Sequence, residues 1–295
     1  MYDVSNTLVI RIRRPQKMTS EIILVGNELL LSKIRDINGF WMMARLLEYG
    51  HDVSRLVIIP DDISTIAKTV LESLSREPMF LFISGGLGPT HDDLTLEGIA
   101  RAFAVPLVLN EKALEFIKER YTKLGKVGIT SVEMYESRKK MAYIPENGKP
   151  LKNLNGTAPS ILIETKSINK NKTKIFAMPG VPSELQSAFN HYVVPLLQHS
   201  ESHYLQAGFI FEKVGESQVA GSIDEIQEEH PEVWIKTHPR IVTGVPVCVE
   251  LHLTSFINSP SQEEIAQRSK ILIEIRDRIK KIVESNGGLV RNVYD

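Results

Sequence analysis

A glycine-rich stretch that ends in two adjacent aspartates is the part of this sequence best equipped for chemistry. It runs over residues 84–97 and reads SGGLGPTHDDLTLE. Its glycines let the backbone adopt positive φ and come close to a ligand. Asp92, Asp93 and Thr95 add side-chain oxygens, which hard divalent cations prefer as ligands. The stretch therefore predicts a site for an anionic ligand, with oxygen atoms available to a cation.

Neither of two common phosphate-binding patterns explains the stretch. No Gly-Lys-Ser/Thr follows the glycines, as it would in a Walker loop, and the dinucleotide pattern G-x-G-x-x-G is absent. The alternative interpretation is an ordinary strand-to-helix turn in which Asp93 or Thr95 caps the helix. Two consecutive aspartates in one turn favour a functional site over that alternative.

The flanking residues predict where the stretch lies in the fold. Residues 79–83, MFLFI, are a short apolar run typical of a buried parallel strand, and a helical pattern follows through Ile99, Ala100 and Phe103. In open α/β sheets, the turn between such a strand and its helix lies at the ligand-binding edge.

The segment from Gly85 to Asp93 resembles the signature of the molybdopterin-binding-like fold. The resemblance is to the branch that contains the competence/damage-inducible CinA proteins and the N-terminal domain of eukaryotic FAD synthase, and it extends from about Glu21 to about Arg240. It implies an α/β fold of three layers, a mostly parallel sheet with helices on both faces, followed by a small α+β domain.

Three further turns resemble loops of this family. The turn after the first predicted strand, residues 21–25, carries Glu28, and an Asp-x-Asn placement follows at Asp36 and Asn38. Position 27 is Asn where the family often has Asp, so we expect no metal ligand there. The two later segments are residues 155–160, NGTAPS, and residues 178–184, MPGVPSE.

We expect the four loops to meet at one edge of one sheet, and the resemblance implies a role for each residue. The catalytic carboxylates would be Asp93, Asp92 and Asp36. The ligands of a divalent metal ion, Mg²⁺ or similar, would be Asp92, Asp93 and Glu28. The substrate-binding residues would be Gly85, Gly86, Gly88, Thr90, Thr95, Asn38, Gly156, Thr157, Gly180, Pro182, Ser183 and Glu184.

Strand and helix patterns alternate after residue 18, which predicts a mostly parallel sheet. One predicted helix starts with Asn38 as N-cap and has an apolar face of Phe40, Met43, Ala44 and Leu47. We interpret Asp61 and Asp62 as caps of the next helix. Further helices are expected at residues 110–120, 132–140 and 182–198, and further strands at 53–59, 161–164 and 174–177.

The chain is expected to have three parts: an N-terminal extension over residues 1–17, a nucleotide domain over 18–200 and a small α+β domain over 201–295. The extension is interpreted either as an extra edge strand or as the result of a start codon upstream of Met18. In the last part, helices are expected at 216–229 and 261–285, and strands at 204–213, 232–236 and 246–254. This part resembles the KH-like domain of CinA proteins, and the C-terminal amidase domain of longer CinA proteins is expected to be missing.

Composition narrows the possible partners. A net charge of −1 gives no electrostatic footprint for nucleic acid or an anionic membrane. The only cysteine, Cys248, excludes an internal disulfide and is interpreted as a small buried strand residue. No long apolar run or signal-peptide pattern is present, so a cytoplasmic location is expected. The expected partners are a small-molecule nucleotide and a second copy of the chain.

Three functions are compatible with these residues. The first is metal-dependent cleavage of a nucleotide pyrophosphate bond, and the resemblance names ADP-ribose as substrate. The second is adenylation of molybdopterin or metal insertion into it, although the molybdopterin enzymes would carry Gly-Gly-Thr-Gly, with Arg before the Asp, where Leu87 and Asp92 stand here. The third is a non-catalytic protein in which the carboxylates hold a magnesium–nucleotide complex.

Overall fold

The chain divides into two compact units. The computed structural model describes residues 19–126, 128, 131, 133–165, 172–197, 202–242, 245–258 and 260–295. One unit consists of residues 18–47 and 51–199, and the other mainly of residues 200–295. The predicted extension at residues 1–17 and the predicted boundary at residues 200–201 lie outside the described residues.

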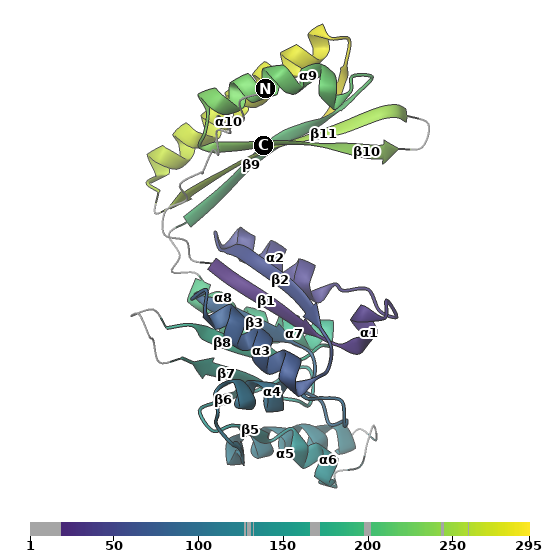
Figure 1. The fold of residues 1–295 in the computed structure, drawn as a ribbon, viewed down its shortest axis with the longest axis vertical. Helices are drawn as coiled ribbons and strands as arrows, with labels where there is room; N and C mark the ends of the chain where they lie inside the picture. The colour runs from purple at the N-terminus through teal and green to yellow at the C-terminus, as the bar shows by residue number, and fades with distance from the viewer. Residues whose placement is uncertain are drawn as a thin grey trace, which may run out of the picture. The chain divides into compact units, whose positions relative to one another are not determined.

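A six-stranded sheet forms the centre of the first unit (Figure 1). In spatial order its strands are β2 (Asp52–Ile59), β1 (Thr19–Val25), β3 (Phe80–Ser84), β8 (Lys174–Met178), β7 (Ser160–Glu164) and β6 (Lys149–Leu151). The first four are parallel to one another, whereas β7 is antiparallel to both of its neighbours. The predicted mostly parallel sheet is therefore confirmed.

Helices cover both faces of this sheet. On one face, Ile23 and Ile83 pack in the same core as residues of α3 (Ile63–Leu74), α4 (Thr95–Ala102) and α5 (Glu111–Lys126). On the other face, Phe82 of β3 contacts Phe189, with ring centroids 5.4 Å apart. Phe189 in turn contacts Trp41 of α2 (Asn38–Glu48) at 5.3 Å. The three layers follow because β1, β3 and β8 are apolar on both sides and must be covered twice.

Helix α2 lies where a helix was predicted but buries a different face. Met42 and Leu46 are fully buried, whereas Phe40 is 69% exposed and Ala44 is also exposed. The predicted face of Phe40, Met43, Ala44 and Leu47 is therefore wrong in phase. The side chain of Asn38 points inward and forms hydrogen bonds to two other loops. Met42 and Leu46 follow at intervals of four residues, so they lie on the same face of the helix as Asn38 and are buried with it.

The predicted helix over residues 182–198 is interrupted. It consists of α7 (Pro182–Ala188), a π-helical segment, η1 (Phe189–Val193), and α8 (Val194–Leu197). Pro195 has no N–H to continue the regular bonding pattern, which accounts for the change at this place. The helix predicted over residues 132–140 is only α6 (Glu136–Lys140) within the described residues.

Short elements that the sequence did not reveal complete the first unit. They are α1 (Asn27–Leu30), β4 (Leu107–Leu109) and β5 (Tyr143–Pro145), and β4 pairs with β5 as a separate antiparallel ribbon. Strand β6 was also missed, because three residues are too few to show an alternating pattern.

The second unit is a four-stranded antiparallel sheet with two helices. Its elements follow in the order β9 (Ser202–Glu212), α9 (Glu216–Glu229), β10 (Val233–Val242), β11 (Val245–Asn258), α10 (Gln262–Ser285) and β12 (Leu289–Tyr294). The sheet order β10-β11-β9-β12 is that of a split βαβ unit. Apolar residues of α9 and α10 pack together with Phe209, Phe211 and Leu251, so both helices lie on one face (Figure 1). The small α+β domain is confirmed, whereas its KH-like character stays a prediction.

Cys248 is buried in β11, as expected. Within the described residues, no helix combines the length and the apolar composition that a membrane span needs.

His51 is a neutral histidine in the core of the first unit. It is 1% exposed, and neither ring nitrogen has a hydrogen-bond partner among the described residues. Its ring lies against Phe80, with centroids 5.6 Å apart. Burial lowers the pKa of His51 from 6.5 to about 4, opposed by the neighbouring Asp52 carboxylate.

We predict that the free energy of unfolding falls as the pH is lowered from 6.5 to 4. In this window the unfolded chain takes up a proton at position 51 and the folded chain does not, so the loss reaches about 3 kcal/mol. His51→Leu should remove most of this pH dependence in urea denaturation. The exposed His203 provides the control, because His203→Leu should retain it. Equal slopes in the wild type and His51→Leu would contradict the prediction.

Candidate functional site

A crevice of about 580 Å³ lies where the loops after β1, β3 and β8 meet. All four predicted loops contribute to its wall. The predicted residues that line it are Glu28, Asp36, Asn38, Gly85, Gly86, Gly88, Thr90, Asp92, Asp93, Thr157, Gly180, Pro182 and Glu184. Three predicted residues, Thr95, Gly156 and Ser183, do not line it.

The start of the glycine loop is held in a conformation that requires glycine. Gly85 and Gly86 have φ of 105° and 63°, in the region that L side chains rarely adopt. A Cβ at Gly85 would lie 2.1 Å from the Val25 carbonyl oxygen, and one at Gly86 would lie 2.4 Å from Thr95 Oγ1. The Thr95 hydroxyl itself donates to the Gly85 carbonyl at 2.8 Å. Thr95 thus stabilises the loop from beneath and does not line the crevice, and its expected binding role stays a prediction.

The end of the loop converges on the hydroxyl of Thr90. Thr90 Oγ1 lies 2.5 Å from Asp92 Oδ1 and 2.5 Å from Asp93 Oδ2, and Thr90 N also donates to Asp93 Oδ2 at 2.8 Å. The bond from the Thr90 hydroxyl lowers the pKa of Asp92. A hydroxyl carries only one hydrogen, so two carboxylates compete for it.

Lys140 of α6 holds this turn from outside. Its ammonium group donates to the carbonyl oxygens of Thr90 at 2.6 Å and of Asp93 at 2.8 Å. The sequence reasoning missed Lys140, which stands 47 residues beyond Asp93 in a helix with no recognisable pattern. The ammonium group of Lys140 thus lies against the backbone of the turn that carries the two adjacent aspartates.

Asp36 takes the capping role that we predicted for Asn38. Asp36 Oδ1 accepts hydrogen bonds from the backbone N–H of Asn38 at 2.9 Å and of Gly39 at 3.1 Å, so Asp36 caps α2 and Asn38 does not. The Asn38 amide nitrogen instead donates to the Gly180 carbonyl at 2.7 Å and to Ser84 Oγ at 3.3 Å. Asn38 therefore joins the loops that follow β1, β3 and β8.

Glu184 connects two loops of the crevice. Its Oε2 accepts a hydrogen bond from Asn153 Nδ2 at 2.6 Å, and its carboxylate occupies the space where a Cβ of Gly156 would lie. The neighbouring Ser183 carbonyl accepts from Asn155 Nδ2 at 3.0 Å. Gly156 and Ser183 thus hold the wall of the crevice in place and do not line it.

Asp61 is a crevice residue that the sequence reasoning missed. Only Asp62 caps α3, through the Thr65 backbone N–H at 2.8 Å, whereas Asp61 Oδ2 accepts from Asn27 N at 2.7 Å. Burial raises the pKa of Asp61, and the carboxylates of Glu28 and Asp92 raise it further against the effect of the Asn27 bond. The position of Asp61 directly after β2, at the carboxyl end of a parallel strand, could have indicated it.

The crevice carries many more acidic than basic groups. Arg35 is the only Lys or Arg among the described residues that line it, whereas Lys33, in the same loop, does not line it. No three His, Cys, Asp or Glu side chains among the described residues are placed to hold a metal ion. Mg²⁺ usually uses one or two carboxylates, several waters and substrate phosphates. Asp92 and Asp93 with the Thr90 hydroxyl fit that kind of site and do not form an all-protein cage.

Two comparisons with known proteins match the first unit. Residues 21–199 match the family model described as a probable molybdopterin binding domain. A solved structure, the CinA protein of unknown function from Thermoplasma acidophilum, is 29% identical with a TM-score of 0.53, and it covers 61% of this chain and 98% of that one.

Relatives of similar length match both units. A protein of Metallosphaera sedula is 34% identical over 278 residues, which is 94% of this chain and 98% of that protein. A protein of Sulfurisphaera tokodaii is 34% identical over 267 residues, which is 90% of this chain and 92% of that protein.

We predict that Asn38→Ala lowers the free energy of unfolding by about 1–3 kcal/mol, because it removes the part-buried hydrogen bond to the Gly180 carbonyl and the buried one to Ser84 Oγ. Asn155→Ala is a matched control, since it removes an amide-to-carbonyl bond of similar length at an exposed position. Urea denaturation of both variants would measure the difference. A loss for Asn38→Ala no larger than that for Asn155→Ala would show that Asn38 does not hold the loops together.

Proposed function

We propose a function for this chain, which belongs to the family of probable molybdopterin binding domains. The crevice of its first unit binds a nucleotide. With the help of a divalent cation, it hydrolyses a pyrophosphate bond of that nucleotide. ADP-ribose, which the CinA resemblance implies, is the substrate that we propose. Water would add to one phosphorus atom while the bridging oxygen leaves with the other, giving AMP and ribose 5-phosphate.

The observation that carries this proposal is the convergence of Asp92 and Asp93 on one hydroxyl. Both carboxylate oxygens lie 2.5 Å from Thr90 Oγ1, which can donate to only one of them. A cation bound there would neutralise the charge that the single proton leaves uncompensated. When bound, a divalent cation polarises phosphate oxygens and lowers the pKa of a coordinated water.

The remaining residues position the ligand and the turn. Backbone N–H groups of the glycine loop and the Arg35 side chain supply the donors for phosphate oxygens, because the crevice has no other basic side chain among its described lining residues. Lys140 fixes the backbone of Thr90 and Asp93, which keeps both carboxylates at the crevice. Asp36 uses one oxygen as the cap of α2, so only its second oxygen is left for a ligand.

Molybdopterin binding is a second candidate, because the family model that matches residues 21–199 carries that description. The same crevice would then receive the phosphate of molybdopterin, and adenylation would transfer AMP from ATP to that phosphate with pyrophosphate as the leaving group. Parallel assays with ADP-ribose and with molybdopterin plus ATP, each with the metal varied, separate the two. Binding without turnover of either would favour a non-catalytic nucleotide-binding protein.

We predict that Asp93→Asn lowers ADP-ribose turnover by about a hundredfold or more, since several kcal/mol of cation stabilisation are lost. The thermal midpoint should stay close to that of the wild type, because an amide oxygen can still accept from Thr90 N. Asp62→Asn changes an aspartate that caps α3 outside the crevice and should leave turnover unchanged. Wild-type turnover in Asp93→Asn would remove this residue from the mechanism.

We predict that a fragment of residues 18–199 binds nucleotide as the full chain does. The described residues that line the crevice all lie between Leu24 and Glu184, within the first unit. Calorimetric titration and light scattering on the fragment and the full chain would test this, and scattering would also test the proposed homodimer. A folded fragment that binds no nucleotide, beside a full chain that does, would place part of the site in the second unit.

A further inference from the structure

A second cavity of about 270 Å³ borders the crevice. The two share Gly86, Leu87, Gly88 and Asp93, so the glycine loop is a wall of both. The remaining lining of the second cavity comes from α4, β4, α6 and β5. Drug-sized ligands occupy pockets of roughly 300–1,000 Å³, so this cavity suits one ring system, while the crevice suits a larger group.

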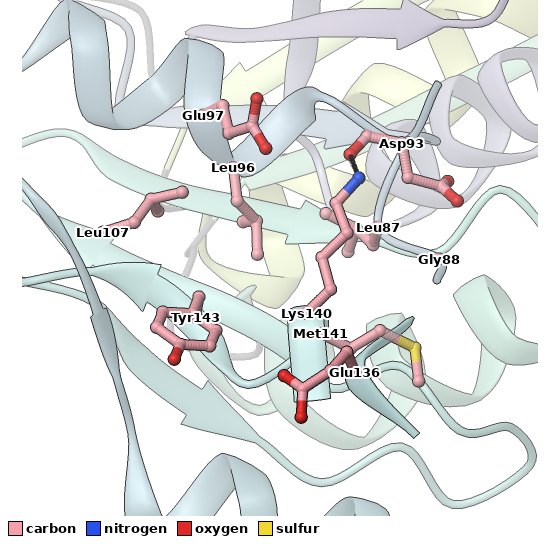
Figure 2. A pocket seen from close by; sticks show the side chains of 11 residues that line it. Leu87, Gly88, Asp93, Leu96, Glu97, Leu107, Glu136, Lys140, Met141 and Tyr143 are labelled. Carbon is pink, nitrogen blue, oxygen red and sulfur yellow. Dashed lines mark hydrogen bonds between the residues drawn. The ribbon is translucent and has the colours of Figure 1, made fainter. Parts of the chain in front are cut away.

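The inner surface of this cavity is apolar. Leu87, Leu96 and Met141 are buried, and Leu107 and the ring of Tyr143 continue the same surface toward the outside (Figure 2). A flat apolar or aromatic group would bury its faces against these side chains. Shape and lining together favour a planar ring over a phosphate or a sugar.

One of the three charged side chains that reach the cavity from α4 and α6 is free to bind a ligand. Glu136 pairs with Lys139 at 2.6 Å, and Lys140 donates to the carbonyls of Thr90 and Asp93. Glu97 is half-buried and makes no hydrogen bond or ion pair with any described residue. In Figure 2 its carboxylate stands above Leu96, on the side of the cavity away from Glu136. A half-buried carboxylate beside apolar carbons needs a donor.

We propose that this cavity binds a planar, amino-substituted heterocycle, with Glu97 accepting a hydrogen bond from the exocyclic amine. The inference rests on the proposed function, because the phosphate groups of the same ligand would lie in the crevice. Gly88 and the Asp93 carboxylate beside it line both cavities, so a ligand that extends past these two residues would reach the crevice with its phosphates. Adenine and pterin rings both have this chemistry, and the experiment separates them.

Glu97 also has a role that needs no ligand, since it lies in the first turn of α4, where a carboxylate stabilises the helix. Glu111 stands in the first turn of α5, exposed and outside the cavity. The same substitution at Glu111 therefore reproduces the helix effect without touching the cavity, which makes it the matched control.

The test is calorimetric titration of the full chain with three probes: AMP, ribose 5-phosphate and an unphosphorylated pterin. Glu97→Leu should weaken binding of the amino-heterocycle by about tenfold to a hundredfold, the effect of losing a hydrogen bond to a charged group. Ribose 5-phosphate, which has no ring base, should bind the variant and the wild type equally. Glu111→Leu should leave all affinities unchanged.

A second variant acts through volume and not through charge. Leu107→Trp adds an indole to the wall of the cavity and should weaken the same amino-heterocycle while sparing ribose 5-phosphate. Thermal midpoints of both variants check folding. Because the two substitutions are on different elements, a shared folding defect cannot account for a loss that is confined to ligands with a ring.

Each outcome decides the proposal. Weaker AMP binding in both variants supports a nucleotide base as occupant, and weaker pterin binding in both supports a pterin. If neither ring ligand binds the wild type, or if both variants bind them as the wild type does, the proposal is overturned. ADP-ribose turnover is measured in parallel as an independent readout. If the protein hydrolyses ADP-ribose but the two variants bind the ring ligands as the wild type does, only this inference is overturned. If binding depends on Glu97 but ADP-ribose is not hydrolysed, only the proposed activity is overturned.

Discussion

The geometry of the crevice depends on the hydrogen bonds that the side-chain amide of Asn38 donates. Its nitrogen bonds Ser84 at the end of β3 and Gly180 after β8, while its backbone is fixed by Asp36 after β1. β1, β3 and β8 are neighbours in the sheet, so one side chain fixes the relative positions of three adjacent strand ends. Glycines complete the arrangement, because Gly85 donates to the Met178 carbonyl and its backbone lies directly against Gly180.

The charge of the crevice follows from where its side chains come from. Parallel strands end at the same edge, so acidic residues that follow β1, β2 and β3 meet there, including Glu28, Asp61 and Asp92. Burial raises the pKa of Asp61, and repulsion from the carboxylates of Glu28 and Asp92 raises it further. The Lys140 side chain comes from α6, outside that sheet, and its ammonium group donates to the carbonyl oxygens of Thr90 and Asp93. A bound cation would relieve this repulsion and would allow an anionic ligand to bind beside the carboxylates.

The sequence predicted the elements that are strongly patterned and the loops directly joined to them. The buried strand before Ser84 and the four loops were found because apolar runs and turn residues are local signals. Asp61 was misassigned because an aspartate before a helix is usually a cap. The face of α2 was wrong because Asn38, a polar residue, takes an inward position. Lys140 could not be found, since its role depends on α6 approaching the loop from a distant part of the chain.

The glycine loop separates two cavities, and this limits what substitutions in it can reveal. Gly86 and Gly88 line both cavities. A side chain at Gly86 would collide with Thr95 beneath the loop before it reached a ligand. Loss of binding in a loop variant could therefore come from either cavity or from the loop itself. Residues that reach a single cavity from another element, such as Asp61 for the crevice and Leu107 for the second cavity, distinguish the two without changing the loop.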